Sequence, residues 1–273
     1  MNLNMRCFAV GPFHADKQVE RLLAKANNQF CSGGETMIRI VCGIAMAMFL
    51  SACGTLTAPQ PNPVFVDQID AYFGKAKNET YTSSGVFTKP IPYSAGQFVV
   101  MGMTSPTEKN VSKISIVGKE QGGWILETYS LTPTAEGISQ MLIVGLEAVA
   151  KTGSMKDIDI VWVKMKNNDQ PVQKLDGVML NMVEGFIQSS ISDLVVRTQT
   201  TPEDGGTVKT LAGIFQGTTK TRGEVSFLGK KYASDSWMHP AVPINGMVKS
   251  VTAEEGQTIE LLDFGLSGAK RSF

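Results

Sequence analysis

The sequence predicts an α+β fold that consists mainly of a curved, mostly antiparallel β-sheet or an open barrel. From Thr80 onward, short apolar segments separated by glycines dominate the chain. Residues 111–117 (VSKISIV) alternate apolar and polar side chains, which is the pattern of a strand with one buried face. One long segment, residues 175–194, has instead the periodicity of an amphipathic helix. Many short strands with few helices are typical of curved sheets and open barrels.

The expected strands lie on both sides of this helix. A shorter amphipathic helix is predicted at residues 64–76, and residues 138–149 fit either a helix or a strand. Glycines, among them Gly217 and Gly223, are expected to separate the strands of the last third. The predicted strands are residues 98–103, 111–117, 124–129, 158–165, 208–211, 215–220, 224–228, 232–237, 247–253 and 258–264.

Residues 37–53 (MIRIVCGIAMAMFLSAC) have the three parts of an export signal. Arg39 provides a positive charge, residues 40–50 form an apolar run, and Ser51-Ala52 are small residues placed before Cys53. The apolar run is too short to span a bilayer, which needs roughly 20 residues. We therefore expect residues 37–52 to be a signal peptide. The alternative is a buried core helix that happens to end in this sequence.

The segment Leu50-Ser51-Ala52-Cys53 resembles the lipobox of bacterial lipoproteins. The resemblance implies transfer of a diacylglycerol to the Cys53 thiol and cleavage before Cys53. Two or more acyl chains hold a protein stably on a membrane. Position 54 is Gly and not the Asp of inner-membrane retention signals, which favours an outer-membrane protein that faces the periplasm.

The remaining chain divides into an extension, a tether and one domain. Residues 1–36 precede the signal, and we expect them to be an annotation extension upstream of a translation start at Met37; a genuine pre-sequence is the alternative. Residues 53–63 contain the lipidated cysteine and a Pro-rich tether with roughly 30 Å of reach. Residues 64–273 are expected to form one β-rich envelope domain.

Charge and residue inventory exclude several functions. Lys+Arg and Asp+Glu both number 25, so the chain lacks the basic excess of a nucleic-acid-binding protein. The four cysteines are Cys7, Cys31, Cys42 and Cys53, and His239 is the single histidine beyond them. We therefore expect no metal site and no cofactor in the body.

The residues that could support catalysis are sparse. His239 could act as a general base, but the chain has no G-x-S-x-G segment to supply a nucleophile. We expect a histidine at a strand end beside the Pro240 turn, and no enzyme; a hydrolase with an unfamiliar site is a third alternative. A carboxylate pair for glycoside chemistry is also conceivable, although exposed strand faces explain the same acidic residues: Glu127, Glu147, Asp157, Asp159, Glu260 and Asp263.

Three segments of the last third suggest a family. Residues 211–215 (LAGIF), 237–243 (WMHPAVP) and 259–265 (IELLDFG) look like a recurring pattern of bacterial envelope proteins. They resemble the periplasmic half-barrel proteins that carry lipoproteins or lipids, such as LolA, LolB and LppX. The resemblance implies a half-barrel with the principal helix on its concave face and an apolar cavity between them.

These observations lead to two functional hypotheses. In the first, the protein is a membrane-anchored lipoprotein that binds or carries a lipid or a lipoprotein acyl chain. Methionines at apolar positions could then form a pliable lining, although ordinary core filling explains them as well. The candidate lining residues on the long helix are Met179, Met182 and Phe186. In the second hypothesis, the protein is a non-catalytic scaffolding lipoprotein of an envelope complex.

Overall fold

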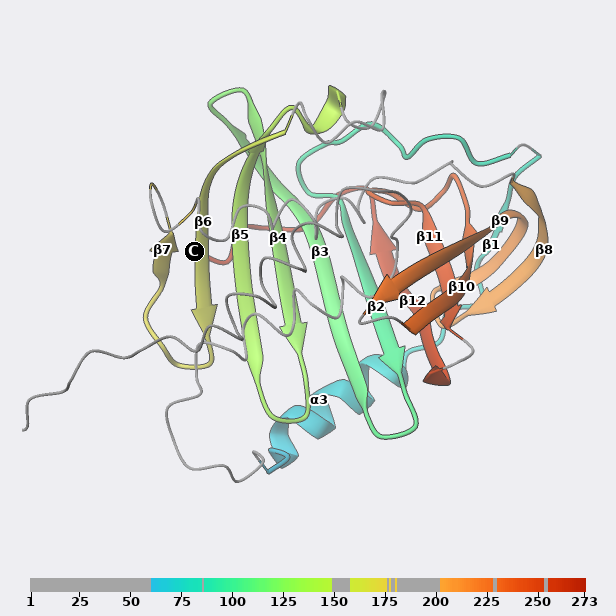
Figure 1. Cartoon of the computed structure of the whole chain (residues 1–273), viewed down its shortest axis with the longest axis horizontal. Helices are drawn as coiled ribbons and strands as arrows, with labels where there is room; N and C mark the ends of the chain where they lie inside the picture. The colour runs from blue at the N-terminus through green and yellow to red at the C-terminus, as the bar shows by residue number, and fades with distance from the viewer. Residues whose placement is uncertain are drawn as a thin grey trace, which may run out of the picture. The chain divides into compact units, whose positions relative to one another are not determined.

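The computed structural model describes residues 60–84, 86–148, 158–175, 177, 180, 202–227, 230–252 and 255–273, and no side chains for 224–227 and 230–232. Within these residues, twelve strands form one open sheet, accompanied by one well-defined helix (Figure 1). The described residues all belong to a single compact unit of the chain, Glu35–Phe273. The predicted mostly antiparallel β-sheet with few helices is therefore confirmed.

Helix α3 (Pro63–Phe73) opens the described part of the chain. Asn62 caps it, because its side-chain oxygen accepts a hydrogen bond from the Val64 N–H at 3.0 Å, and proline occupies the first helical position. The N–H of Asn62 also donates to the Pro133 carbonyl at 2.7 Å, which fixes the start of α3 to the turn between β4 and β5. The helix ends at Phe73, slightly before the predicted boundary.

The strands have the following bounds: β1 (Thr80–Thr82), β2 (Phe98–Thr104), β3 (Lys109–Glu120), β4 (Gly123–Leu131), β5 (Glu136–Val144), β6 (Asp159–Asn167), β7 (Gln173–Leu175), β8 (Glu203–Thr210), β9 (Gly213–Phe227), β10 (Lys230–Met238), β11 (Met247–Thr252) and β12 (Gln257–Gly265). Their order in the sheet is β1-β9-β10-β11-β12-β2-β3-β4-β5-β6-β7, and β8 pairs with β9 outside this path. Among the described strands, every pairing is antiparallel except that of β1 with β9.

Strand β2 joins two meanders into one sheet. It pairs with β3 on one side and with β12 on the other, where Met101 lies opposite Leu261 and Val99 opposite Phe264. The green and yellow strands β2–β6 and the orange and red strands β9–β12 therefore meet at the β2–β12 pair (Figure 1).

Two details differ from the sequence prediction. The segment predicted as two strands separated by Gly223 is one long strand, β9, that runs through both Gly217 and Gly223. Residues 138–149, which fitted either structure, belong mostly to β5, and a helical turn begins only at residue 146. Gly217 lies at a register shift of the β8–β9 ladder, and Gly223 pairs with Ser234 of β10, so neither glycine ends the strand.

The start of the long predicted helix is also different. Leu175 belongs to strand β7, whereas residues 177 and 180 are helical. Leu175 and Leu180 are both buried in the main apolar cluster of the sheet. The rest of the predicted helix, which includes Met179, Met182 and Phe186, lies outside the described residues.

The sheet buries apolar residues on both faces. We call the side that packs against α3 the helix face; here Ile69 of the helix contacts Val100, Val111, Leu131 and Leu262 of the sheet. Burial of a side chain such as Ile69, which is 2% exposed, contributes roughly 1.5–3 kcal/mol. The opposite side carries a larger apolar cluster, because neighbouring residues of a strand point to opposite faces.

Gly217 allows close approach between β9 and the segment after β1. Its φ of 73° is in the left-handed region, and a Cβ at this position would lie 2.1 Å from the Ser83 carbonyl oxygen. Gly206 has a similar φ of 63° but open space around the corresponding position. Alanine substitutions at the two glycines can therefore be compared. At Gly206 the substitution costs only backbone strain, whereas at Gly217 it must also push β9 away from Ser83.

We predict that Gly206→Ala lowers the free energy of unfolding by about 1–2 kcal/mol, the cost of a left-handed alanine. Gly217→Ala should cost clearly more, because the strand must also move away from Ser83. Urea unfolding of both variants measures the difference. Equal losses would show that β9 and the Ser83 segment do not need this close contact.

Candidate functional site

The main apolar cluster of the sheet is the candidate functional site. It extends across strands of both meanders, from Ile160 and Val163 on β6 to Phe215 on β9. Loop residues Phe87, Val242 and Ile244 complete it. The cluster therefore forms a continuous apolar face of the sheet opposite α3, and its core members are at most 9% exposed.

Methionines are concentrated on this surface, and we call it the methionine face. Every methionine in the described part of the chain is either a buried member of the cluster or packs against it. The helix face instead contains valine, leucine, isoleucine and aromatic residues. The methionines are Met101, Met103, Met141, Met165, Met238 and Met247.

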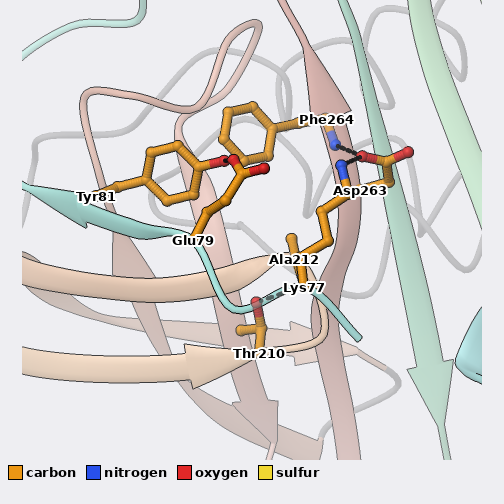
Figure 2. Close-up of polar contacts among 7 residues, drawn as sticks. All are labelled: Lys77, Glu79, Tyr81, Thr210, Ala212, Asp263 and Phe264. Atoms are coloured by element: carbon orange, nitrogen blue, oxygen red, sulfur yellow. Dashed lines mark hydrogen bonds and ion pairs between the residues drawn. The ribbon is translucent and has the colours of Figure 1, made fainter. Parts of the chain in front are cut away.

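An aromatic group lies at one side of the methionine face. The Tyr81 ring stacks on Phe215 with 5.0 Å between ring centroids, and its centroid lies 5.1 Å from that of Phe264 in an edge contact. The Tyr81 hydroxyl donates to the Glu79 carboxylate (Figure 2). Burial and then this hydrogen bond raise the pKa of Tyr81 to about 12. The phenol is therefore protonated at neutral pH and acts as a donor rather than a base.

An ion pair next to this aromatic group joins the chain after α3 to β12. Lys77 Nζ lies 2.6 Å from Asp263 Oδ1, and the Phe264 N–H donates to the same oxygen at 2.8 Å (Figure 2). Both charged side chains are about two-fifths exposed, so the pair contributes little to stability. In the same view, the Ala212 N–H donates to the Thr210 hydroxyl in the turn between β8 and β9. These contacts hold the backbone in place, and each polar side chain drawn in Figure 2 has a partner.

His239 has a structural environment, as the sequence predicted. It directly follows β10, is 1% exposed, and packs edge-on against Phe215. Its Nδ1 accepts from the Ala241 N–H at 3.1 Å, so Nε2 carries the proton and donates to the Gln216 carbonyl at 3.2 Å. Burial lowers the pKa of His239. The ring is therefore neutral, and both nitrogens have partners.

The candidate carboxylates are dispersed over the described structure. Glu127 lies buried on the helix face, where it accepts from Gln140 at 2.7 Å and from the Ser272 N–H at 2.9 Å. Asp159 is exposed between buried Ile158 and Ile160, as the alternation predicted.

Of the remaining acidic candidates, two have a polar partner, and a third lies outside the described residues. Glu147 accepts from Trp124, and Glu260 faces Lys249 across the β11–β12 pair, where burial raises the pKa of Glu260. Asp157 lies outside the described residues. Among those that are described, no three His, Cys, Asp or Glu side chains lie close enough to hold a metal ion.

A second polar group on the methionine face was not predicted from the sequence. The Tyr93 ring meets the Trp124 ring edge-on at 6.4 Å. The Trp124 N–H donates to Glu147 at 2.7 Å, and Lys119 lies over the Trp124 ring. The Tyr93 hydroxyl oxygen is buried without a hydrogen-bond partner. No sequence signal could show this, since it depends on contacts between distant segments.

A small hollow lies beside α3 on the helix face. It has a volume of about 180 Å³ and is lined by Val66, Ile69, Asp70, Lys109 and Pro133. Pockets for drug-sized ligands measure roughly 300–1,000 Å³. This hollow is therefore too small to hold a lipid chain.

The predicted site residues Cys53, Met179, Met182 and Phe186 lie outside the described residues. Within the described part of the chain, no helix is both long and apolar enough to cross a membrane. Comparison of the chain with models of known protein families and with curated protein sequences finds no match.

We predict that His239 makes the protein less stable in mild acid. Its folded-state pKa lies below the ordinary value of about 6.5, so the unfolded chain binds the proton first as the pH falls. The free energy of unfolding should be constant above pH 6.5 and decrease below it. Urea unfolding between pH 7.5 and 5.5 measures this slope.

His239→Gln should flatten the slope between pH 7.5 and 5.5. Both variants are prepared as the unprocessed chain of 273 residues, in which His14→Gln removes the other histidine; this control should leave the slope unchanged. A slope that survives in His239→Gln would contradict the neutral, buried state of the ring.

Proposed function

We propose that the protein is a lipid-anchored lipoprotein of the cell envelope that binds an apolar ligand, a lipid or an acyl chain, on its methionine face. The observation that carries this proposal is the confinement of the described methionines to one side of the sheet. Valine, leucine and isoleucine occur on both faces, whereas the clusters of the helix face contain no described methionine.

The chemistry of methionine supports a binding surface. Its side chain is unbranched and polarizable and adapts to ligands of irregular shape. Designed cores use methionine sparingly, because its flexibility specifies a single packing poorly. Met141 and Met165 are only partly buried, so they offer a surface that a ligand can reach.

The proposed anchor agrees with the start of the domain. A signal at residues 37–52 followed by Cys53 would attach a diacylglycerol to the chain, and residues 53–63 would form the tether. The tether would then end at the Asn62 cap of α3. The proposed location is the outer membrane on its periplasmic side, in line with Gly54. The open antiparallel sheet also agrees with the resemblance to half-barrel lipid carriers.

A scaffolding lipoprotein is the second candidate. Its support is the tight burial of much of the methionine face: Met101 is 3% exposed and Met103 9%. Such burial is typical of a solid core. The functional surface would then lie on the outside of the molecule. Native mass spectrometry of the protein extracted from membranes distinguishes the two candidates, because only the first predicts co-purified lipid beyond the anchor.

We predict that Cys53→Ser abolishes labelling with radioactive palmitate and releases the protein from membranes. The reason is that the proposed diacylglycerol is attached to this thiol. Membrane fractionation and labelling measure the outcome, with Cys42→Ser as the matched control. Persistent labelling of Cys53→Ser would eliminate the lipoprotein proposal.

We predict that the double variant Met141→Gln, Met165→Gln weakens binding of a fluorescent fatty-acyl probe at least severalfold. The new amides would have to lose water to contact an acyl chain. Because both positions are partly exposed, each change should cost only about 1 kcal/mol of stability. Fluorescence titration measures affinity and urea unfolding measures stability.

Val161→Thr provides the control on the other side of the sheet. Val161 is partly buried on β6 and packs against the helix-face cluster of Ile125, Leu142 and Trp162. The Val161→Thr substitution should lower the stability by a similarly small amount and should not change the affinity for the probe. Undiminished probe binding by the double methionine variant would favour the scaffold.

A further inference from the structure

The hollow beside α3 is open to solvent and is lined mainly by apolar side chains. Of its lining residues, Ile69 is buried, at 2% exposed, whereas Val66 and Pro133 are only partly buried. The remaining two, Asp70 and Lys109, are exposed. The hollow is therefore an apolar site that a group from outside the molecule can reach.

The size of the hollow matches one aromatic ring. Its volume is about 180 Å³, and an apolar cavity of roughly 150 Å³ is large enough to bind benzene. A methyl group would leave most of this space empty and would lose the contacts with the walls. The hollow therefore suits a single side chain that carries a ring.

Contacts between the neighbouring segments hold the hollow in shape. The Pro133 carbonyl accepts from the Asn62 N–H at 2.7 Å, which ties the turn between β4 and β5 to the start of α3. Lys109 Nζ lies 3.0 Å from Asp70 Oδ1 and 5.2 Å from the centre of the Phe73 ring, which holds the lysine side chain against α3. A partner therefore meets a preformed site, and little binding free energy is lost in ordering it.

The α3 side of the hollow carries a surplus negative charge. The Asp70 carboxylate is balanced by Lys109. Asp67 is exposed and has no salt bridge in the part of the chain that the structure describes. Residues three apart on a helix are neighbours on its surface, so Asp67 lies next to Asp70. A cation beside a group bound in the hollow is therefore attracted, whereas an anion is repelled.

We propose that the hollow binds one aromatic side chain of a partner protein, at a point where lysine or arginine is adjacent to the aromatic residue in the partner's sequence. Val66, Ile69 and Pro133 would remove the ring from water, and the Asp67 carboxylate would attract the neighbouring cation. The hollow lies on the helix face, whereas the proposed apolar ligand is assigned to the methionine face. The inference therefore goes beyond the proposed function and does not depend on it.

The test uses the full chain in a non-ionic detergent and three immobilised short peptides that differ in their central sequence: Lys-Trp-Lys, Lys-Ala-Lys and Glu-Trp-Glu. Surface plasmon resonance measures the affinities. The wild type should bind Lys-Trp-Lys about ten- to hundredfold more tightly than Lys-Ala-Lys, the range expected for burial of one large apolar side chain. It should prefer Lys-Trp-Lys to Glu-Trp-Glu by about two- to fivefold, the range expected for one exposed charge pair.

Two substitutions on α3 test whether the hollow is the binding site. Val66→Phe places a ring of the protein's own in the hollow and should reduce the affinity for Lys-Trp-Lys to that for Lys-Ala-Lys. Val64→Phe is the matched control, because Val64 is 58% exposed and does not line the hollow. It should leave the affinity for Lys-Trp-Lys unchanged. The midpoint of urea unfolding shows whether both variants are folded.

A separate pair of substitutions tests the charge and does not depend on the stability of Val66→Phe. Asp67→Asn should bind Lys-Trp-Lys and Glu-Trp-Glu equally, because it removes the surplus carboxylate. Glu203→Gln, which removes an exposed carboxylate from β8, is the matched control and should keep the preference of the wild type.

Each contrary result has a definite meaning. Equal binding of Lys-Trp-Lys and Lys-Ala-Lys by the wild type overturns the inference, as does undiminished binding of Lys-Trp-Lys by a folded Val66→Phe. A preference for Glu-Trp-Glu, or a preference for Lys-Trp-Lys that persists in Asp67→Asn, overturns the choice of a basic partner. Free indole that binds as tightly as Lys-Trp-Lys overturns the choice of a protein partner, because a small aromatic ligand then suffices. Binding of the fatty-acyl probe is measured separately, so none of these results decides the proposed function.

Discussion

The pairing of β2 with β12 determines most of the architecture. These strands come from opposite ends of the domain, and their antiparallel register from Phe98–Gly265 to Thr104–Thr258 joins the two meanders into one sheet. The position of α3 depends on the same pair. A Cβ at Gly102 of β2 would lie 2.6 Å from Phe73 and 2.8 Å from Leu262, so the helix packs directly onto the junction. The apolar clusters on the two faces are continuous only because this pair forms.

Alternation along the strands turns this single sheet into two different surfaces. Val99, Met101 and Met103 of β2 point to one face, whereas Val100 and the Gly102 position point to the other. The helix face is closed by α3 and by the segment around Ser272, which bonds to Glu127. The face with the methionines includes the Tyr93 hydroxyl, a polar group without a partner in the described structure. The two faces of the sheet therefore differ in chemistry: all the described methionines lie on one of them.

Local patterns in the sequence predict much of this fold. Alternation in residues 111–117 and apolar segments elsewhere were sufficient to place β2, β3, β4 and β6, and the helical spacing of apolar residues was sufficient to place α3. The continuity of β9 could not be predicted, because it depends on distant strands: Gly217 lies at a register shift of the β8–β9 ladder, and Gly223 pairs with Ser234 of β10. The structural environment of His239 followed from its position beside Pro240 at a strand end.

The site was less predictable than the fold. The sequence indicated that methionines occupy apolar positions, but only strand pairing shows that Met101 and Met247 share one cluster. The Tyr93 hydroxyl has no hydrogen-bond partner because the fold places its ring against Trp124. Long-range register and hydrogen-bond satisfaction are global properties, and neither is encoded in the period of a single segment.

The bond between the Asn62 N–H and the Pro133 carbonyl has a mechanical consequence. If the chain before α3 is held by a lipid in a membrane, any pull on the domain reaches the folded structure first at this bond. The force then acts on α3, whose apolar contacts with β2 and β12 can be peeled away from the end of the helix. The ladder between β2 and β12 lies behind the helix and bears load only afterwards. For a chain anchored in this way, α3 would detach from the sheet under tension before the β2–β12 pairing is broken.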